Sequence, residues 1–206
     1  MIRTRAAVAV CLLVALAASG CGRTGKAAAP ATTPLFRGTV LTPPVRTSGF
    51  SLRDQSGKPV TLAGQRGSFV ILAFLYTHCP DVCPLIADQL NLALNRLGPR
   101  RRNVRVLAVS VDPRRDTRAA VRRFVAEHRL LPQFRYLMGT RAQLVPVWRA
   151  YQLAAMQASN GVNHSADEML IDPRGRGRVI YEAGIKAAAV LHDLGLLEAR
   201  SGTPYR

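Results

Sequence analysis

Cysteine, aromatic residues and acidic residues are all scarce in this chain. Its 206 residues include 4 cysteines, 6% aromatic residues, and 12 acidic residues against 29 lysines and arginines. So few cysteines exclude a fold that depends on several disulfides. The stretch of about 155 residues after the N-terminal region can bury a core without them. The chain has no internal repeat, and we expect one domain over residues 49–200.

Apolar runs long enough to span a bilayer are also lacking, because a spanning helix needs roughly 20 apolar residues. The run over residues 6–18 is shorter, follows two arginines and precedes Ser19, Gly20 and Cys21. This order predicts a bacterial secretory signal over residues 1–20. A cysteine after small residues is also the pattern of a lipoprotein signal, in which Cys21 is acylated, although Ala18 stands where such signals usually carry leucine. The alternative is an uncleaved membrane anchor. Both place the domain at the extracytoplasmic face of the bacterial cell membrane.

Residues 21–48 are rich in glycine, alanine, threonine and proline and show no apolar periodicity. We expect a disordered, flexible tether there, which would lift the domain off the lipid surface.

The excess of positive charge is typical of nucleic-acid-binding proteins, but two observations exclude that class. The export signal removes the chain from the cytoplasm, and no basic stretch contains the aromatic residues that stack on bases. We therefore expect no nucleic-acid partner, and attribute the charge to arginine-rich composition and to attraction to anionic lipid headgroups.

The apolar patterns of the remaining chain predict strands and helices in an α/β order. The strands are expected at residues 68–76, 104–111, 134–138, 168–171 and 178–182, after a hairpin of residues 50–53 and 59–62. The helices are expected at residues 83–97, 118–128, 142–151 and 187–197. This order predicts a thioredoxin-like fold, with a central mixed β-sheet flanked by helices and an N-terminal β-hairpin.

Cys79 and Cys83 are the two free thiols that the mature protein is expected to keep, and they lie where a buried strand passes to a helix. The first turn of a helix favours negative charge, so we expect lowered thiol pKa values and reactive sulfurs. Side chains four residues apart on a helix can both reach one metal ion or, with adjustment, each other. The pair can be a structural disulfide, a redox couple or a clamp for a soft metal. A structural zinc ion needs four ligands, whereas two thiolates and one imidazole suit Cu(I).

Four histidines compete for the third ligand position: His78, His128, His164 and His192. His78 would point away from Cys79 if the strand continued to it. His128 and His192 lie in predicted helices among charged or surface-like neighbours. His164 lies in a loop just before a strand, where α/β folds carry functional groups. A lone histidine in a loop is usually only solvated, so spacing alone does not identify the third ligand.

Three blocks of sequence resemble the SCO/SenC family. They are Phe74–Pro84 with both cysteines, Ser110–Thr117, and Val162–Ser165 leading to Leu170–Asp172. The similarity runs from about Phe50 to Leu197. In that family a thioredoxin-like domain binds copper and helps to build the binuclear copper centre of cytochrome c oxidase.

The resemblance implies that Cys79, Cys83 and His164 bind copper, as Cu(I) and in addition as Cu(II) if that state forms. It implies no catalytic turnover. The expected partners are the copper-binding subunit of the oxidase, a copper donor protein or thioredoxin-like reductant, and the membrane through a lipid anchor. In an oxidised form the two cysteines would form a disulfide.

Asp112 and Asp116 match an acidic block of the family and are candidates for orienting a ligand or contacting a partner. The alternative is that Asp112-Pro113 form a strand-ending turn and Asp116-Thr117 a helix cap. Asn163 departs from the acidic residue common in the family.

Two other functions remain open at this point. A thiol–disulfide oxidoreductase would reduce the copper-ligand cysteines of the oxidase subunit, with Cys79 as the attacking thiolate. The second open function is that of a peroxidase-like relative. Redox thioredoxins usually carry CxxC and need no imidazole, so CxxxC with His164 favours the metal site.

Overall fold

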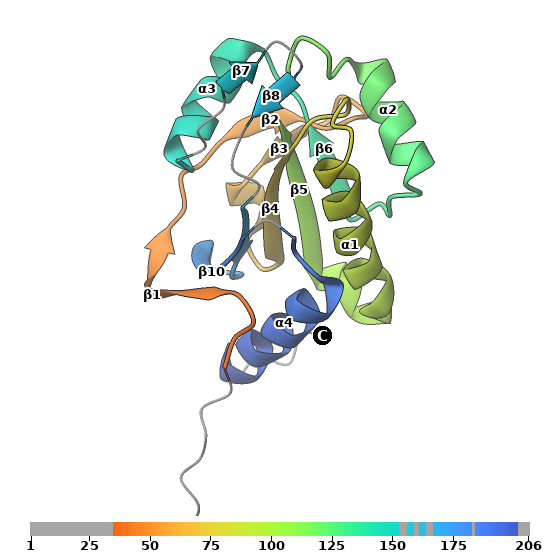
Figure 1. The fold of residues 1–206 in the computed structure, drawn as a ribbon. Helices are drawn as coiled ribbons and strands as arrows, with labels where there is room; N and C mark the ends of the chain where they lie inside the picture. The colour runs from red at the N-terminus through yellow and green to blue at the C-terminus, as the bar shows by residue number, and fades with distance from the viewer. Residues whose placement is uncertain (1–34, 153–155, 159–160, 164–166, 183, 202–206) are drawn as a thin grey trace, which may run out of the picture. The chain divides into compact units, whose positions relative to one another are not determined.

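The computed structural model describes residues 35–152, 156–158, 161–163, 167–182 and 184–201. Its central sheet has six strands in the order β1-β10-β9-β4-β5-β6. Strands β4 (Phe69–Leu75), β5 (Val104–Ser110) and β6 (Phe134–Leu137) are parallel to one another. Strands β9 (Glu168–Ile171), β10 (Arg176–Tyr181) and β1 (Thr39–Arg46) extend the sheet in antiparallel pairs. The mixed sheet and its flanking helices confirm the predicted thioredoxin-like α/β fold (Figure 1).

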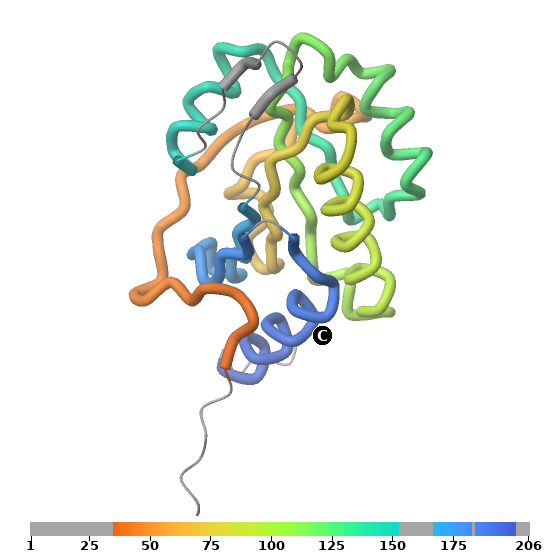
Figure 2. The backbone as a smooth tube through the Cα atoms, in the orientation of Figure 1, coloured from red at the N-terminus to blue at the C-terminus, as the bar shows by residue number. Residues whose placement is uncertain are grey.

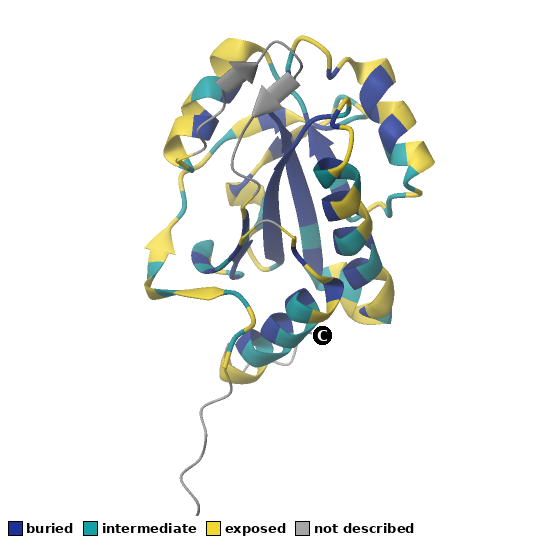
Figure 3. Ribbon diagram, viewed as in Figure 1, coloured by how far each residue is buried: buried dark blue, intermediate teal, exposed yellow. Residues whose placement is uncertain are grey.

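The four α-helices agree with the predicted positions. They are α1 (Val82–Arg96), α2 (Arg118–Glu127), α3 (Arg141–Ala150) and α4 (Ala187–Ser201). In Figures 1 and 2, α1 and α2 lie on one side of the sheet and α3 on the other. All seven residues of β4 are buried, and Figure 3 shows β4 and β5 as the buried centre of the sheet. The run predicted a strand covered on both faces, and the structure confirms it.

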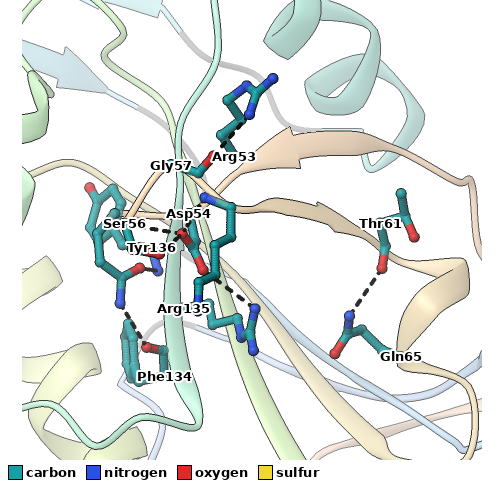
Figure 4. Close-up of polar contacts among 11 residues, drawn as sticks. Arg53, Asp54, Ser56, Gly57, Thr61, Gln65, Phe134, Arg135 and Tyr136 are labelled. Carbon is teal, nitrogen blue, oxygen red and sulfur yellow. Dashed lines mark hydrogen bonds and ion pairs between the residues drawn. The ribbon is translucent and has the colours of Figure 1, made fainter.

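The predicted N-terminal hairpin is also confirmed, as β2 (Ser51–Arg53) paired with β3 (Pro59–Thr61). The Asp54 carboxylate holds its turn by accepting hydrogen bonds from Ser56 N at 2.9 Å and Lys58 N at 3.0 Å (Figure 4). The turn is joined to the edge strand β6, since Tyr136 N donates to Gln55 Oε1 at 2.9 Å. Gln55 thus provides a hydrogen-bond partner for a backbone N–H group on the free edge of β6.

The predicted tether over residues 21–48 is wrong for its last part, because Thr39–Arg46 form the edge strand β1. This strand escaped the sequence analysis because its side chains are mostly exposed and two prolines interrupt it. Prolines lack an N–H group and are confined to edge strands and bulges, and here they lie in the register shift between Val40 and Val45. The preceding chain is held by the buried Asp193 carboxylate, which accepts from Arg37 N at 2.8 Å and Gly38 N at 3.0 Å.

A short hairpin precedes β9 and a tight turn follows it. The sequence predicted a loop around His164, and the three residues before it form β8 (Gly161–Asn163), which pairs with β7 (Met156–Ala158) in a short hairpin. Beyond β9, a turn leads to β10: Asp172 accepts hydrogen bonds from the backbone of Arg174 and Arg176, and Gly175 adopts a φ of 72°.

No helix within the described residues is long and apolar enough to cross a bilayer. The predicted signal over residues 1–20 and the predicted lipidation site Cys21 lie outside those residues.

The buried side chain of Glu168 has a shifted pKa, which makes the free energy of unfolding depend on pH. Glu168, the first residue of β9, is 1% exposed, and its Oε2 has no hydrogen-bond partner among the described residues. Burial, followed by the nearby charge of Asp167, raises the pKa of Glu168 to about 9. The folded protein therefore keeps a proton here that the unfolded chain loses above about pH 4.5.

We predict that the free energy of unfolding falls as pH rises between about 4.5 and 9, by up to about 1.4 kcal/mol per pH unit from this group. Glu168→Gln keeps the shape without the charge, so it should flatten this part of the profile and stabilise the protein at about pH 8. Urea unfolding across the pH range measures both effects. The exposed Glu182→Gln is the control, and a Glu168→Gln profile parallel to that of the unsubstituted protein would contradict the assignment.

Candidate metal centre

Cys79 and Cys83 lie at the junction between β4 and α1, as predicted. The strand ends at Leu75, and Cys79 N donates to Tyr76 O at 3.3 Å in the following turn. The Asp81 side chain caps the helix by accepting from Val82 N at 2.5 Å, and Cys83 is the second residue of α1. Cys79 therefore precedes the helix, and the regular helical spacing assumed for the pair does not apply.

A direct hydrogen bond holds the two cysteines together. Cys83 N donates to Cys79 Sγ at 3.3 Å, so the Cys79 sulfur takes the place of a cap on an N–H group of the first helical turn. Both thiols are free. Cys83 is fully buried and Cys79 is 7% exposed, so a reagent or partner can reach the pair only from the Cys79 side.

The predicted lowering of the thiol pKa values is wrong for Cys83. Burial raises the pKa of the Cys83 thiol, and the hydrogen bond and charge of Cys79 act in the same direction. Loss of water around the sulfur thus outweighs the favourable end of the helix. Burial, followed by a hydrogen bond with Cys79, also raises the pKa of Tyr76 to about 12. Burial therefore favours the protonated form of Cys83 when no metal ion is bound.

Asp116 positions the turn that carries Cys79. Its Oδ1 accepts from Thr77 N at 2.8 Å and from the Thr77 hydroxyl at 2.7 Å. Its Oδ2 accepts from the Ser110 hydroxyl at 2.5 Å and the Tyr136 hydroxyl at 3.1 Å. Burial raises the pKa of Asp116, and these hydrogen bonds act against the rise. The carboxylate therefore joins β5, β6 and the residues just before Cys79.

The structure also shows which of the alternative roles apply. The predicted helix cap at Asp116-Thr117 is confirmed at Thr117, the N-cap of α2, whose side chain accepts from Ala120 N at 3.2 Å, whereas the Asp116 side chain makes the contacts described above. Asp112 does form the strand-ending turn, in which its carbonyl accepts from Arg115 N and Asp116 N. The Asp112 carboxylate is buried and pairs with Arg115 Nε at 2.5 Å. Sequence could not choose between these roles, because each uses the same residue types at the same strand end.

Three of the four histidines make other contacts. His78 is exposed and its Nδ1 lies 3.0 Å from the Thr77 hydroxyl. His128 Nδ1 lies 2.8 Å from the Asp88 carboxylate, and His192 Nε2 lies 3.0 Å from Leu35 O. The described residues contain no cluster of three or more His, Cys, Asp or Glu side chains that could hold a metal ion. His164 lies outside them, between β8 and β9.

We predict that Asp116→Ala lowers the free energy of unfolding by about 3 kcal/mol, because it leaves several buried donors without an acceptor. Asp112→Ala, which removes a half-exposed ion pair, should cost about 1 kcal/mol or less. Urea unfolding of the reduced proteins measures the difference. Asp116→Ala should also speed the reaction of Cys79 with a thiol reagent, whereas equal effects of the two substitutions would contradict a positioning role for Asp116.

Comparison with known proteins identifies a family and structures of similar fold. A model of the SCO1/SenC family matches residues 41–196. The bovine protein SCO2 homolog, mitochondrial, is 34% identical over 134 residues, which cover 61% of this chain and 50% of the bovine protein. This chain thus spans about half the length of that relative.

Two solved structures are similar to the described domain. The structure of Bradyrhizobium japonicum ScoI with copper bound has 29% sequence identity and a TM-score of 0.66, covering 73% of this chain and 98% of that one. The solution structure of apo Sco1 from Thermus thermophilus has 28% identity and a TM-score of 0.70, covering 79% and 97%. The family match over most of the chain confirms the resemblance found in the sequence blocks: this protein belongs to the SCO1/SenC family.

Proposed function

We propose that this protein is a membrane-tethered copper chaperone that binds copper through Cys79, Cys83 and His164 and delivers it to the binuclear copper centre of cytochrome c oxidase. The observation that carries the proposal is the pair of reduced thiols held side by side in a buried junction. Two sulfur donors that pack within the hydrophobic core suit Cu(I), a soft ion that accepts few ligands. A relative with 29% identity has been solved with copper bound.

Copper is cargo in this proposal. The burial of Cys83 and the greater exposure of Cys79 explain how copper could be both bound and released. Metal binding must displace the proton of Cys83, whose pKa is raised by burial, so binding releases protons and weakens as pH falls. Cys79 is the more accessible sulfur, so a recipient would replace it first in a stepwise exchange of ligands. Each bond from copper to this chain would be replaced by a bond to a ligand of the recipient, so the oxidation state of copper stays the same and no catalytic turnover is required.

His164 is the proposed third ligand. It directly follows β8 and precedes β9, whose Leu170 and Met169 pair with Ile71 and Leu72 of β4. The strand after His164 is thus a neighbour of the strand that leads to the cysteines. An imidazole from this connection would complete a site of two thiolates and one nitrogen.

Attachment to the membrane is the remaining part of the proposal. It rests on the apolar run before Ser19-Gly20-Cys21 and places the domain at the extracytoplasmic face, with Cys21 acylated.

We predict that the chain from Pro34 onward, which retains β1, binds one Cu(I) under anaerobic conditions in competition with a chelator of known affinity. Cys79→Ser and Cys83→Ser should each weaken binding by orders of magnitude, because each removes a soft ligand. His164→Ala should weaken binding with the fold intact, whereas His128→Ala, which alters an imidazole paired with Asp88, should not. Unchanged affinity in both cysteine variants would exclude this site.

The same two sulfurs favour a second candidate, a thiol–disulfide oxidoreductase that keeps the recipient's cysteines reduced. The favouring observation is the adjacency of two free thiols of unequal access, which is the arrangement of an attacking and a resolving thiol. The buried, protonated Cys83 makes that chemistry slower.

Oxidase assembly in a deletion strain separates the two candidates. We predict that His164→Ala fails to restore assembly at limiting copper, although its dithiol still exchanges with disulfides. Cys79→Ser should fail as well. Assembly restored by His164→Ala but not by Cys79→Ser would favour the reductase.

A further inference from the structure

Five arginines lie within the ten residues Arg96–Arg105, and none of these ten residues is acidic. Arg96 ends α1, and three more lie in the short helix η2 (Gly98–Asn103). Three of the four arginines from Arg96 to Arg102 are exposed, and Arg101 is half-buried. We call Arg96, Arg100, Arg101 and Arg102 the η2 arginine cluster.

The cluster lies at the opposite end of the domain from the cysteines. Cys83 is in the first turn of α1, and η2 follows the last turn of the same helix. The 15 residues of α1 span about 20 Å. Figure 1 shows α1 running from the end of the sheet where β4 and β5 finish to the end where α4 packs.

The described chain begins at the same end as the cluster. Arg100 forms an ion pair with Glu198 of α4. The same helix binds the start of the described chain, through the contact of His192 Nε2 with Leu35 O and the hydrogen bonds that Asp193 accepts from Arg37 and Gly38. Any anchor that precedes Leu35 therefore joins the domain beside η2 rather than beside the cysteines.

We propose that the η2 arginine cluster binds anionic lipid headgroups and so orients the anchored domain with Cys79 and Cys83 away from the bilayer. The inference rests on the membrane attachment proposed above. About 14 residues connect Cys21 to Leu35 and reach at most about 50 Å, so the anchored domain stays near the surface. Guanidinium groups bind phosphate oxygens through paired hydrogen bonds, and the attraction acts within a Debye length of about 8 Å.

The surface chosen for comparison is on α2. Arg122 and Arg123 are exposed, like most of the cluster, but they lie in the middle of α2 rather than beside α4. Substituting them changes the net charge by the same amount as substituting two residues of the cluster. Comparing the two pairs of substitutions therefore distinguishes binding at the η2 arginine cluster from a general effect of positive charge.

The test uses the full chain reconstituted into vesicles of phosphatidylcholine alone, or with about 30% phosphatidylglycerol. Phenylglyoxal modifies accessible arginines, and mass spectrometry gives the rate at each position. On anionic vesicles we expect modification at Arg100–Arg102 to slow by about fivefold or more, with Arg114, Arg122 and Arg123 unchanged. About 0.5 M salt, which shortens the Debye length to about 4 Å, should abolish the difference.

Substitutions then test the cluster itself. Arg101→Gln with Arg102→Gln should remove the protection that anionic lipid gives to Arg96 and Arg100, whereas Arg122→Gln with Arg123→Gln should leave it. No selective protection of the cluster, or equal protection of α2, would overturn the orientation. Failure of the chain to sediment with phosphatidylcholine vesicles would overturn the attachment on which it rests. Neither result bears on copper binding, which the titration measures separately.

Discussion

The placement of the cysteine pair depends on one buried carboxylate. Asp116 accepts hydrogen bonds from Thr77, Ser110 and Tyr136, which belong to three separate parts of the sheet region. Thr77 is two residues from Cys79, so the end of β4 cannot move without breaking a charge-assisted hydrogen bond. Tyr136 is in turn held by Gln55 of the N-terminal hairpin. An element remote in sequence thus helps to fix the turn before the cysteine pair.

The pair of thiols is governed by two opposed effects. The first turn of a helix stabilises a thiolate, and burial destabilises it. At Cys83 burial prevails, which keeps the thiol protonated and less open to oxidation. In the proposed function, the positive charge of a bound metal ion would stabilise the thiolate in place of the water that burial removes. The burial that opposes a bare thiolate is therefore compatible with the proposed copper site.

Sequence patterns predicted the parts of the fold in which local and tertiary preferences agree. Continuous apolar runs located β4 and β5, and apolar residues at helical spacing located the helices. The edge strand β1 was missed because an exposed strand interrupted by Pro43 and Pro44 has no buried alternation, and its pairing partner β10 is distant in the sequence. The junction of both cysteines was predicted, but the raised pKa of Cys83 was not, because burial is a property of the packed domain. His164 stays a prediction from family resemblance.

The distribution of charge also follows from packing. Six of the 12 acidic residues are buried: Asp54, Asp112, Asp116, Glu168, Asp172 and Asp193. Short carboxylates can accept several backbone N–H groups inside turns, as Asp54 and Asp172 do, whereas long cationic side chains reach solvent from almost any position. No lysine or arginine within the described residues is buried. Half of the acidic residues thus serve the interior, and the surface is more basic than the composition alone suggests. Such a surface is the kind that the proposed contact with anionic lipid requires.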